Sequence, residues 1–128
     1  MRIVRLLAAA ALLVAAMTIA SSPVAAKSGD IVKTGSCTGA ADWKLKAGKD
    51  NGRIEVEFEV DSNHNGQVWR VKVIDNGVLR HRGRHTTMAP SGSFTVRRLI
   101  ANMAGPDDIV ARARNLSSGQ LCVAKLTI

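Results

Sequence analysis

One short segment constrains the fold more than any other part of this chain. Between Arg53 and Val60 the sequence reads Arg-Ile-Glu-Val-Glu-Phe-Glu-Val, with an apolar residue at every second position. A period of two places the apolar side chains on one face of an extended strand and the charged ones on the other, whereas a helix would mix them. The segment therefore predicts a half-buried β-strand with one face toward solvent.

Six further segments have the composition and the flanking turns of short strands. Turn-forming pairs such as Asn76-Gly77 and Gly105-Pro106 separate them. They lie at about 43–47, 69–73, 78–85, 93–99, 108–115 and 120–127. Seven strands in one small domain predict an all-β fold, an antiparallel sandwich or a small barrel. The expected core is Ile54, Val56, Phe58, Val60, Trp69, Val71, Val73, Phe94, Val96, Ile109, Ala111 and Ala113.

The strand content, an inward Trp69 on the third strand and a final hairpin at 108–127 resemble an immunoglobulin-like or fibronectin type III-like sandwich. The resemblance covers about residues 37–128. The whole chain also resembles the small secreted proteins common in high-GC Gram-positive bacteria. The resemblance implies a single antiparallel sandwich of about seven strands, and it brings no known activity with it.

The connection at Asn65-Gly66 leaves one alternative open. A two-residue turn there would make 53–75 a direct hairpin, with Val60 opposite Val71. In an immunoglobulin-like sandwich the two strands belong to different sheets, and the same residues form a crossover. Matching faces in the hairpin would arise by chance about half the time, because only the parity of the register is at stake. The strand count favours the crossover.

The first 26 residues have the order of a secretory signal peptide. Arg2 and Arg5 precede an apolar run from Leu6 to Ala20, and small residues lead to an expected cleavage site after Ala26. The apolar run is too short to span a bilayer comfortably, and no second such run follows. The chain is therefore expected to be secreted, without a transmembrane segment.

Residues 27–41 are rich in Lys, Ser, Thr, Gly and Ala, and they are expected to form a flexible segment before a folded domain at 42–128. This segment carries Cys37, and the second cysteine is Cys122. Since disulfides persist in exported proteins, the pair predicts one bridge, worth roughly 4.5 kcal/mol in the chain-entropy model. It would tie edge strands, whereas immunoglobulin domains carry theirs across the core beside the tryptophan. An intermolecular pair and a reactive thiol are the alternatives.

The charge balance favours an anionic partner. The chain has 18 Lys and Arg against 10 Asp and Glu, and loss of Arg2 and Arg5 leaves 16 basic residues and a net charge of +6. That balance suits nucleic acid, cell-wall polymers or a lipid surface, although it also serves solubility. The scarcity of aromatic residues, two Trp, two Phe and no Tyr, is evidence against stacking on sugars or single-stranded nucleic acid.

The densest basic stretch is Arg-His-Arg-Gly-Arg-His at 80–85. Alternation along a strand places its arginines on one side and His81 and His85 on the other, with Gly83 as a candidate bulge. We favour a protected edge strand over an anion-binding edge whose charge rises as the histidines protonate at about pH 6.5.

A broader basic patch follows from the immunoglobulin-like topology. The strands at 69–73, 78–85, 108–115 and 120–127 would share a sheet, and the three glutamates of 53–60 would lie on the opposite one. The candidate anion-binding residues on the outer face of the shared sheet are Arg70, Lys72, Arg80, Arg82, Arg112, Arg114 and Lys125.

The segment 61–66 fits the first half of a calcium loop. Asp61, Asn63 and Asn65 would supply oxygen ligands at alternate positions, and the glycine that follows would form the turn. Such a loop needs a bidentate glutamate at its twelfth position, where this chain has Lys72. A polar turn without metal is the alternative.

Catalysis finds little support in the sequence. It contains no nucleophile elbow, paired-cysteine spacing, glycine-rich phosphate loop or H-E-x-x-H helix. Asp107-Asp108, after Gly105-Pro106, is interpreted as the solvated start of a strand. A small hydrolase or an inhibitor of one remains an alternative, and a hydrolase would need a pocket that gathers His64, His81 or His85 with an acid.

The sequence therefore predicts a secreted, non-enzymatic binding or adhesion module without a cofactor. Its expected partner is an anionic envelope polymer or another surface protein, and no specific nucleic acid is expected. A calcium-responsive module that uses the 61–66 loop is the second alternative.

Overall fold

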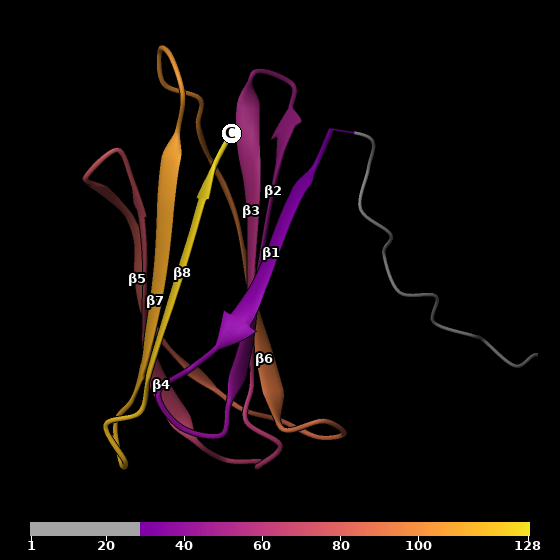
Figure 1. Ribbon diagram of the computed structural model, residues 1–128, viewed down its shortest axis with the longest axis vertical. Coiled ribbons are helices and arrows are strands. Elements are labelled where there is room, and N and C mark those ends of the chain that lie inside the picture. The colour runs from indigo at the N-terminus through magenta and orange to yellow at the C-terminus, as the bar shows by residue number, and fades with distance from the viewer. Residues whose placement is uncertain (1–28) are drawn as a thin grey trace, which may run out of the picture.

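The computed structural model describes residues 29–128, which form eight β-strands and no helix. Two antiparallel four-stranded sheets lie face to face (Figure 1), in the orders β1-β2-β3-β6 and β5-β4-β7-β8. This all-β arrangement fits an immunoglobulin-like sandwich. The expected signal peptide, residues 1–26, lies outside the described residues. The strands are β1 Ile31–Ser36, β2 Asp42–Asp50, β3 Arg53–Asp61, β4 Val68–Asp75, β5 Val78–Thr86, β6 Ser93–Ala101, β7 Asp108–Asn115 and β8 Leu121–Thr127.

All seven predicted strands are present, as β2 to β8. The alternation of β3 places its apolar residues between the sheets, and its glutamates are half-buried on the outer face. The tight turn at Asn76-Gly77 joins β4 to β5, with φ values of 47° and 79°. Asn and Gly tolerate this left-handed backbone, which matches the twist of a two-residue hairpin.

The connection between β3 and β4 is a crossover, and the 53–75 hairpin does not form. β3 pairs with β2 and β6, whereas β4 pairs with β5 and β7. Gly66, with a φ of 80°, donates its N–H to the Thr87 carbonyl oxygen at 2.7 Å, which ties the crossover to the segment after β5. The prediction that β4, β5, β7 and β8 share one sheet is confirmed.

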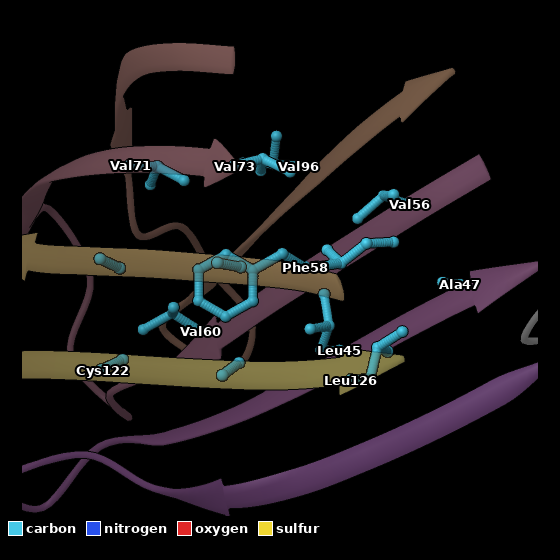
Figure 2. Close-up of a cluster of buried hydrophobic side chains, with 14 of the residues drawn as sticks. Leu45, Ala47, Val56, Phe58, Val60, Val71, Val73, Val96, Cys122 and Leu126 are labelled. Carbon is cyan, nitrogen blue, oxygen red and sulfur yellow. The ribbon is translucent and has the colours of Figure 1, made fainter. Parts of the chain in front are cut away.

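The core lies between the two sheets and contains every side chain predicted for it. Figure 2 shows part of it, including Val56, Phe58 and Val71. Trp69 is fully buried, and its ring centroid lies 6.4 Å from that of Phe94. Burial of large apolar side chains at about 1.5–3 kcal/mol each is the main stabilising contribution to such a fold. The core also includes residues that were not predicted, namely Ala41, Leu45, Ala47, Ile100, Cys122, Ala124 and Leu126.

The prediction of a flexible segment at 27–41 is wrong over its described part. β1 forms an edge strand that pairs antiparallel with β2, so the folded domain begins before residue 42. After β1, the Cys37 N–H donates to the Ala41 carbonyl oxygen and the Thr38 N–H donates to that of Leu121, both at 2.8 Å. These hydrogen bonds hold the chain against β2 and β8.

The predicted disulfide is present between Cys37 and Cys122. Cys37 follows β1, and Cys122 lies in β8. β1 and β8 are edge strands of opposite sheets, so the bridge closes one side of the sandwich and does not cross its centre, as predicted.

Candidate anion-binding face

The outer face of the β5-β4-β7-β8 sheet carries an array of basic side chains. On β4, Val71 and Val73 are buried and the residues beside them are not. The same alternation turns arginines outward on β7 and β5. We call the following six residues the cationic face: Arg70, Lys72, Arg82, Arg84, Arg112 and Arg114. All are exposed except Lys72, which is half-buried.

The strand register arranges the cationic face in two rows. Arg70 lies opposite Arg84 of β5 and Arg114 of β7. Lys72, in the second row, lies opposite one arginine on each of the same two strands. Neighbouring strands are about 4.8 Å apart and residues two apart along a strand are about 6.8 Å apart, so six positive groups are concentrated in a small area.

Two shallow hollows follow the sheet on either side of β4. The first, of about 360 Å³, lies over β4 and β7 and is lined by Arg70, Lys72, Arg112, Arg114, Gly119 and Leu121. The second, of about 450 Å³, lies over β4 and β5 and is lined by Arg70, Lys72, Arg82, Gly83 and Arg84. Arg70 and Lys72 border both hollows, so any group that enters either hollow would meet the β4 cations.

The six cations form no ion pair with any carboxylate of residues 29–128. Arg70 and Lys72 lie at the centre of the array, where every cross-strand neighbour is an arginine. Like charges directly opposite one another destabilise a sheet. The face therefore carries a concentration of charge that the fold does not neutralise.

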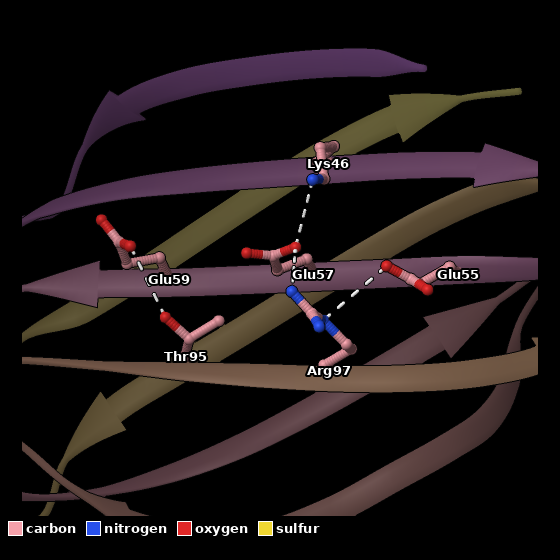
Figure 3. A network of polar contacts seen from close by, with 6 residues as sticks. All are labelled: Lys46, Glu55, Glu57, Glu59, Thr95 and Arg97. Carbon is pink, nitrogen blue, oxygen red and sulfur yellow. Dashed lines mark hydrogen bonds and ion pairs between the residues drawn. The ribbon is translucent and has the colours of Figure 1, made fainter. Parts of the chain in front are cut away.

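The outer face of the other sheet is arranged differently (Figure 3). There Glu57 accepts from Lys46 and from Arg97, both at 3.2 Å, and Arg97 also lies 3.7 Å from Glu55. Partial burial raises the pKa of Glu57, but hydrogen bonds and charges from Lys46 and Arg97 outweigh it and leave the pKa below its ordinary value. Basic and acidic groups neutralise one another on this sheet, in contrast to the cationic face.

Arg80, a predicted anion-binding residue, stands apart from the cationic face. It is the extra residue of a β-bulge, because Leu79 lies opposite Ile74 and His81 lies opposite Val73. Arg80 is half-buried, and its Nε has no hydrogen-bond partner among the described residues. A bulge re-aims the side chains of its strand, which accounts for the loss of Arg80 from the array.

The predicted bulge at Gly83 is wrong, since Gly83 lies in regular register opposite Val71. Lys125, the last predicted cation, is exposed on β8 opposite Val110 and lies one row beyond the cationic face. Arg84, which the predicted set of anion-binding residues omits, completes the first row. The alternation of the basic stretch at 80–85 places Arg84 on the same side of the strand as Arg82, so the sequence could have predicted it.

The 61–66 segment has a structural role in the crossover. The Asp61 carboxylate accepts the Asn63 N–H at 2.9 Å, which forms an Asx turn. The Ser62 hydroxyl lies 3.1 Å from the carbonyl oxygens of His64 and Gly92. Among residues 29–128 no three His, Cys, Asp or Glu side chains are grouped so that they could hold a metal ion. The calcium site at Asp61, Asn63 and Asn65 stays a prediction.

His81 and His85 lie on the side of β5 away from its arginines, as the alternation predicts, and both rings contact residues of β6. Their Nε2 atoms are 3.0 Å apart. The charged group hydrogen-bonded to them is Arg98, whose Nε donates to Nδ1 of His81 at 3.1 Å. The third histidine, His64, is exposed in the crossover. The structure thus pairs the two β5 histidines with a cation.

Two acidic residues are buried side chains that the sequence did not predict. Asp75 and Asp107 are 0% and 1% exposed, so the interpretation of Asp107 as solvated is wrong. Both oxygens of Asp75 and one of Asp107 have no hydrogen-bond partner among the described residues. Burial and the neighbouring Asp107 carboxyl raise the pKa of Asp75 to about 6, against the opposing charge of Arg80.

The structure includes no helix, within the residues it describes, that is long and apolar enough to cross a bilayer. In comparisons with known proteins, the chain matches no family model, no curated protein and no solved structure.

Proposed function

We propose that this chain is a secreted, non-enzymatic binding module that holds an anionic polymer on its cationic face. One observation carries the proposal: six basic side chains lie in two adjacent rows, without an ion pair to the described residues. Secretion is supported by the disulfide, since such bridges persist in oxidising compartments, and by the composition of the first 26 residues.

The chemistry of the face favours phosphate groups or other acidic groups along an extended chain. Five of the six cations are arginines, whose planar guanidinium donates two parallel hydrogen bonds to a phosphate or carboxylate. Two hollows run beside the β4 cations, so consecutive anionic groups of one polymer meet consecutive basic residues. An anionic polymer of the cell envelope has this chemistry.

Stacking on aromatic rings has no place in the proposed binding mode. The four aromatic residues of the chain, Trp43, Trp69, Phe58 and Phe94, lie in the core or pack against it. Proteins that bind single-stranded nucleic acid use exposed rings as platforms for the bases. The cationic face offers charge and guanidinium hydrogen bonds, which recognise a backbone of acidic groups and not a base sequence.

Charge reversal on each sheet separates the cationic face from net charge. We expect R112E/R114E to weaken co-sedimentation with isolated bacterial envelopes, and binding to inorganic polyphosphate, by at least about tenfold. The matched control, K44E/R53E, makes the same change of net charge on the opposite sheet and should bind nearly as the wild type. The slope of log affinity against log salt should also fall by about 2 in R112E/R114E, because each lost phosphate contact lowers it by about 1.

Two outcomes would overturn the proposal. Equal losses in R112E/R114E and K44E/R53E would show that net charge, and not this face, drives binding. Binding of the wild type that does not change between about 20 and about 500 mM salt would point to an apolar or polypeptide partner such as another surface protein.

A further inference from the structure

The two long sides of the sandwich are closed by different chemistry. On one side the Cys37–Cys122 bridge joins the β1 end of one sheet to β8 of the other. On the other side β5 and β6 are the edge strands, and two histidines, an arginine and a phenylalanine meet between them. We call Arg98, His81, His85 and Phe94 the histidine contact.

The histidine contact is a chain of side chains that leads from β6 to β5 and back. Arg98 of β6 donates from Nε to Nδ1 of His81 at 3.1 Å, and the two histidine Nε2 atoms are 3.0 Å apart. The His85 ring then stacks on Phe94 of β6, with centroids 5.6 Å apart and an interplanar angle of 25°. The same two imidazole rings therefore contact both edge strands.

Gly83 makes this geometry possible. A Cβ at Gly83 would lie 3.3 Å from atoms of the His81 ring and 3.4 Å from Nε2 of His85. Such separations are tighter than most real Cβ contacts, so a larger residue would press the rings apart. The absent side chain gives the two imidazoles room to meet over the strand.

The hydrogen bonds require both rings to be neutral. Nδ1 of His81 accepts from Arg98, so the proton of a neutral His81 lies on Nε2. That Nε2–H then donates to Nε2 of His85, which leaves the His85 proton on Nδ1. A proton added to either acceptor nitrogen breaks one of these two hydrogen bonds. A metal ion fits poorly, because a metal on Nε2 of His81 needs a proton on Nδ1, where Arg98 donates.

Every charged neighbour of the pair opposes protonation. β6 contributes Arg98, and the facing residues of β4 are the uncharged Trp69, Val71 and Val73, which lie opposite β5. Partial burial lowers the pKa of His81 and of His85; Arg98 lowers both further, and His85 adds to the shift of His81. Acidification would bring three positive groups together between the two edge strands.

We propose that the histidine contact is an acid-sensitive closure of the sandwich: protonation of His81 and His85 breaks the chain to Arg98 and releases β5 from β6. The opposite side stays closed, because its bridge is covalent and does not titrate. This inference does not depend on the polymer-binding proposal, although β5 also carries Arg82 and Arg84 of the cationic face. If the protein did not bind an anionic polymer, the proposed acid response would be unaffected.

Nuclear magnetic resonance of the imidazole nitrogens tests the first step on the wild-type protein. We expect His81 to be protonated on Nε2 and His85 on Nδ1 at neutral pH, and both to titrate below the ordinary histidine pKa of about 6.5. Titration of His81 and His85 at or above about pH 6.5, or the opposite tautomer of His81, would overturn the proposal.

Amide hydrogen exchange from about pH 8 to about pH 4.5, a range that brackets the histidine titration, tests the release. After correction for intrinsic exchange, protection of β5 and β6 should fall by at least about tenfold below the histidine midpoint, while that of β8 stays unchanged. An H81Q/H85F variant keeps an acceptor for Arg98 and a ring on Phe94, so its acid response should be lost, and H64Q should keep it. Equal acid responses in H81Q/H85F and H64Q would refute the proposal, as would a uniform loss of protection in wild-type β5, β6 and β8.

Discussion

At the scale of single residues, the protonation of Asp75 links stability to pH near neutrality. It is fully buried, and burial and the Asp107 carboxyl raise its pKa to about 6 from an ordinary 3.8. Since the folded state binds this proton more tightly than the unfolded state, the stability that Asp75 contributes is complete below about pH 3.8 and is lost as the pH rises through about 6. At pH 7 its carboxylate therefore opposes folding.

Replacement of Asp75 by asparagine should remove this penalty. We expect D75N to raise the free energy of unfolding at pH 7 by on the order of 2 kcal/mol, since each unit of pKa shift corresponds to about 1.4 kcal/mol. The gain should vanish near pH 4, where the wild-type group is protonated as well. Urea unfolding at both pH values measures it, with D50N at the half-buried end of β2, beside the Asn51-Gly52 turn, as the control. A D75N protein less stable than wild type at pH 7 would contradict the assignment.

The buried acids also show where prediction from the sequence ends at this scale. Asp107 and Asp108 are adjacent and chemically identical, yet one is buried and the other is exposed. Composition favours solvent for both, because an unpaired buried carboxylate is costly. Likewise, the alternation at 80–85 correctly placed the arginines and the histidines on opposite sides of the strand. The bulge that removes Arg80 from the row depends on how β5 pairs with β4, and the sequence of one strand does not predict that pairing.

At the scale of elements, β1 shows how much the disulfide contributes. β1 pairs on one side only, with β2, and its burial is confined to isolated positions. The bridge from Cys37 to β8 fixes its end. We expect C37S/C122S to lower the free energy of unfolding by roughly 2–5 kcal/mol, as for other small secreted domains.

Loss of the bridge should also act locally. Amide exchange in β1 should quicken more than in the central strand β3, which pairs with β2 and β6 and needs no covalent support. The control is reduction of the wild-type protein, which should reproduce the exchange pattern of C37S/C122S. An unchanged pattern in β1 would show that its hydrogen bonds to β2 hold the strand without the bridge.

β1 was also the one strand that the sequence did not predict, for a physical reason. Its sequence, Ile-Val-Lys-Thr-Gly-Ser, lacks the alternation of β3, because an edge strand with little burial needs few apolar residues. The other seven strands, β2 to β8, were predicted from their periodicity and their turns. The β3–β4 crossover was favoured over the hairpin by strand count alone, since both connections keep the same residues facing inward.

At the scale of the whole molecule, the two sheets differ in how their outer charges are compensated. The β1-β2-β3-β6 sheet combines glutamates with Lys46 and Arg97 in ion pairs. The cationic face of the other sheet has only basic cross-strand neighbours around Arg70 and Lys72. The sandwich thus has one locally neutralised face and one face that repels itself, which is the asymmetry expected of a binding surface for anions.

Self-repulsion on the cationic face makes stability depend on salt. We expect the melting temperature to rise between about 20 and about 500 mM sodium chloride, because added ions screen charges that lie within a Debye length of one another. Millimolar tripolyphosphate should raise it further at constant ionic strength, since an anion that binds only the folded state stabilises it by mass action.

The variant R70Q tests which charges are responsible. Arg70 faces an arginine on each neighbouring strand, and removal of two such repulsions should stabilise the protein at low salt by about 0.5–1 kcal/mol while reducing its response to salt and to tripolyphosphate. The same substitution on the other sheet, R53Q, should leave both responses nearly as in wild type. If R70Q and R53Q behaved alike, the salt dependence would report net charge, and the cationic face would lose its standing as a distinct site. If only R70Q showed a smaller rise in melting temperature with salt and tripolyphosphate, the repulsion in the free protein would come from the same side chains that are proposed to hold the polymer.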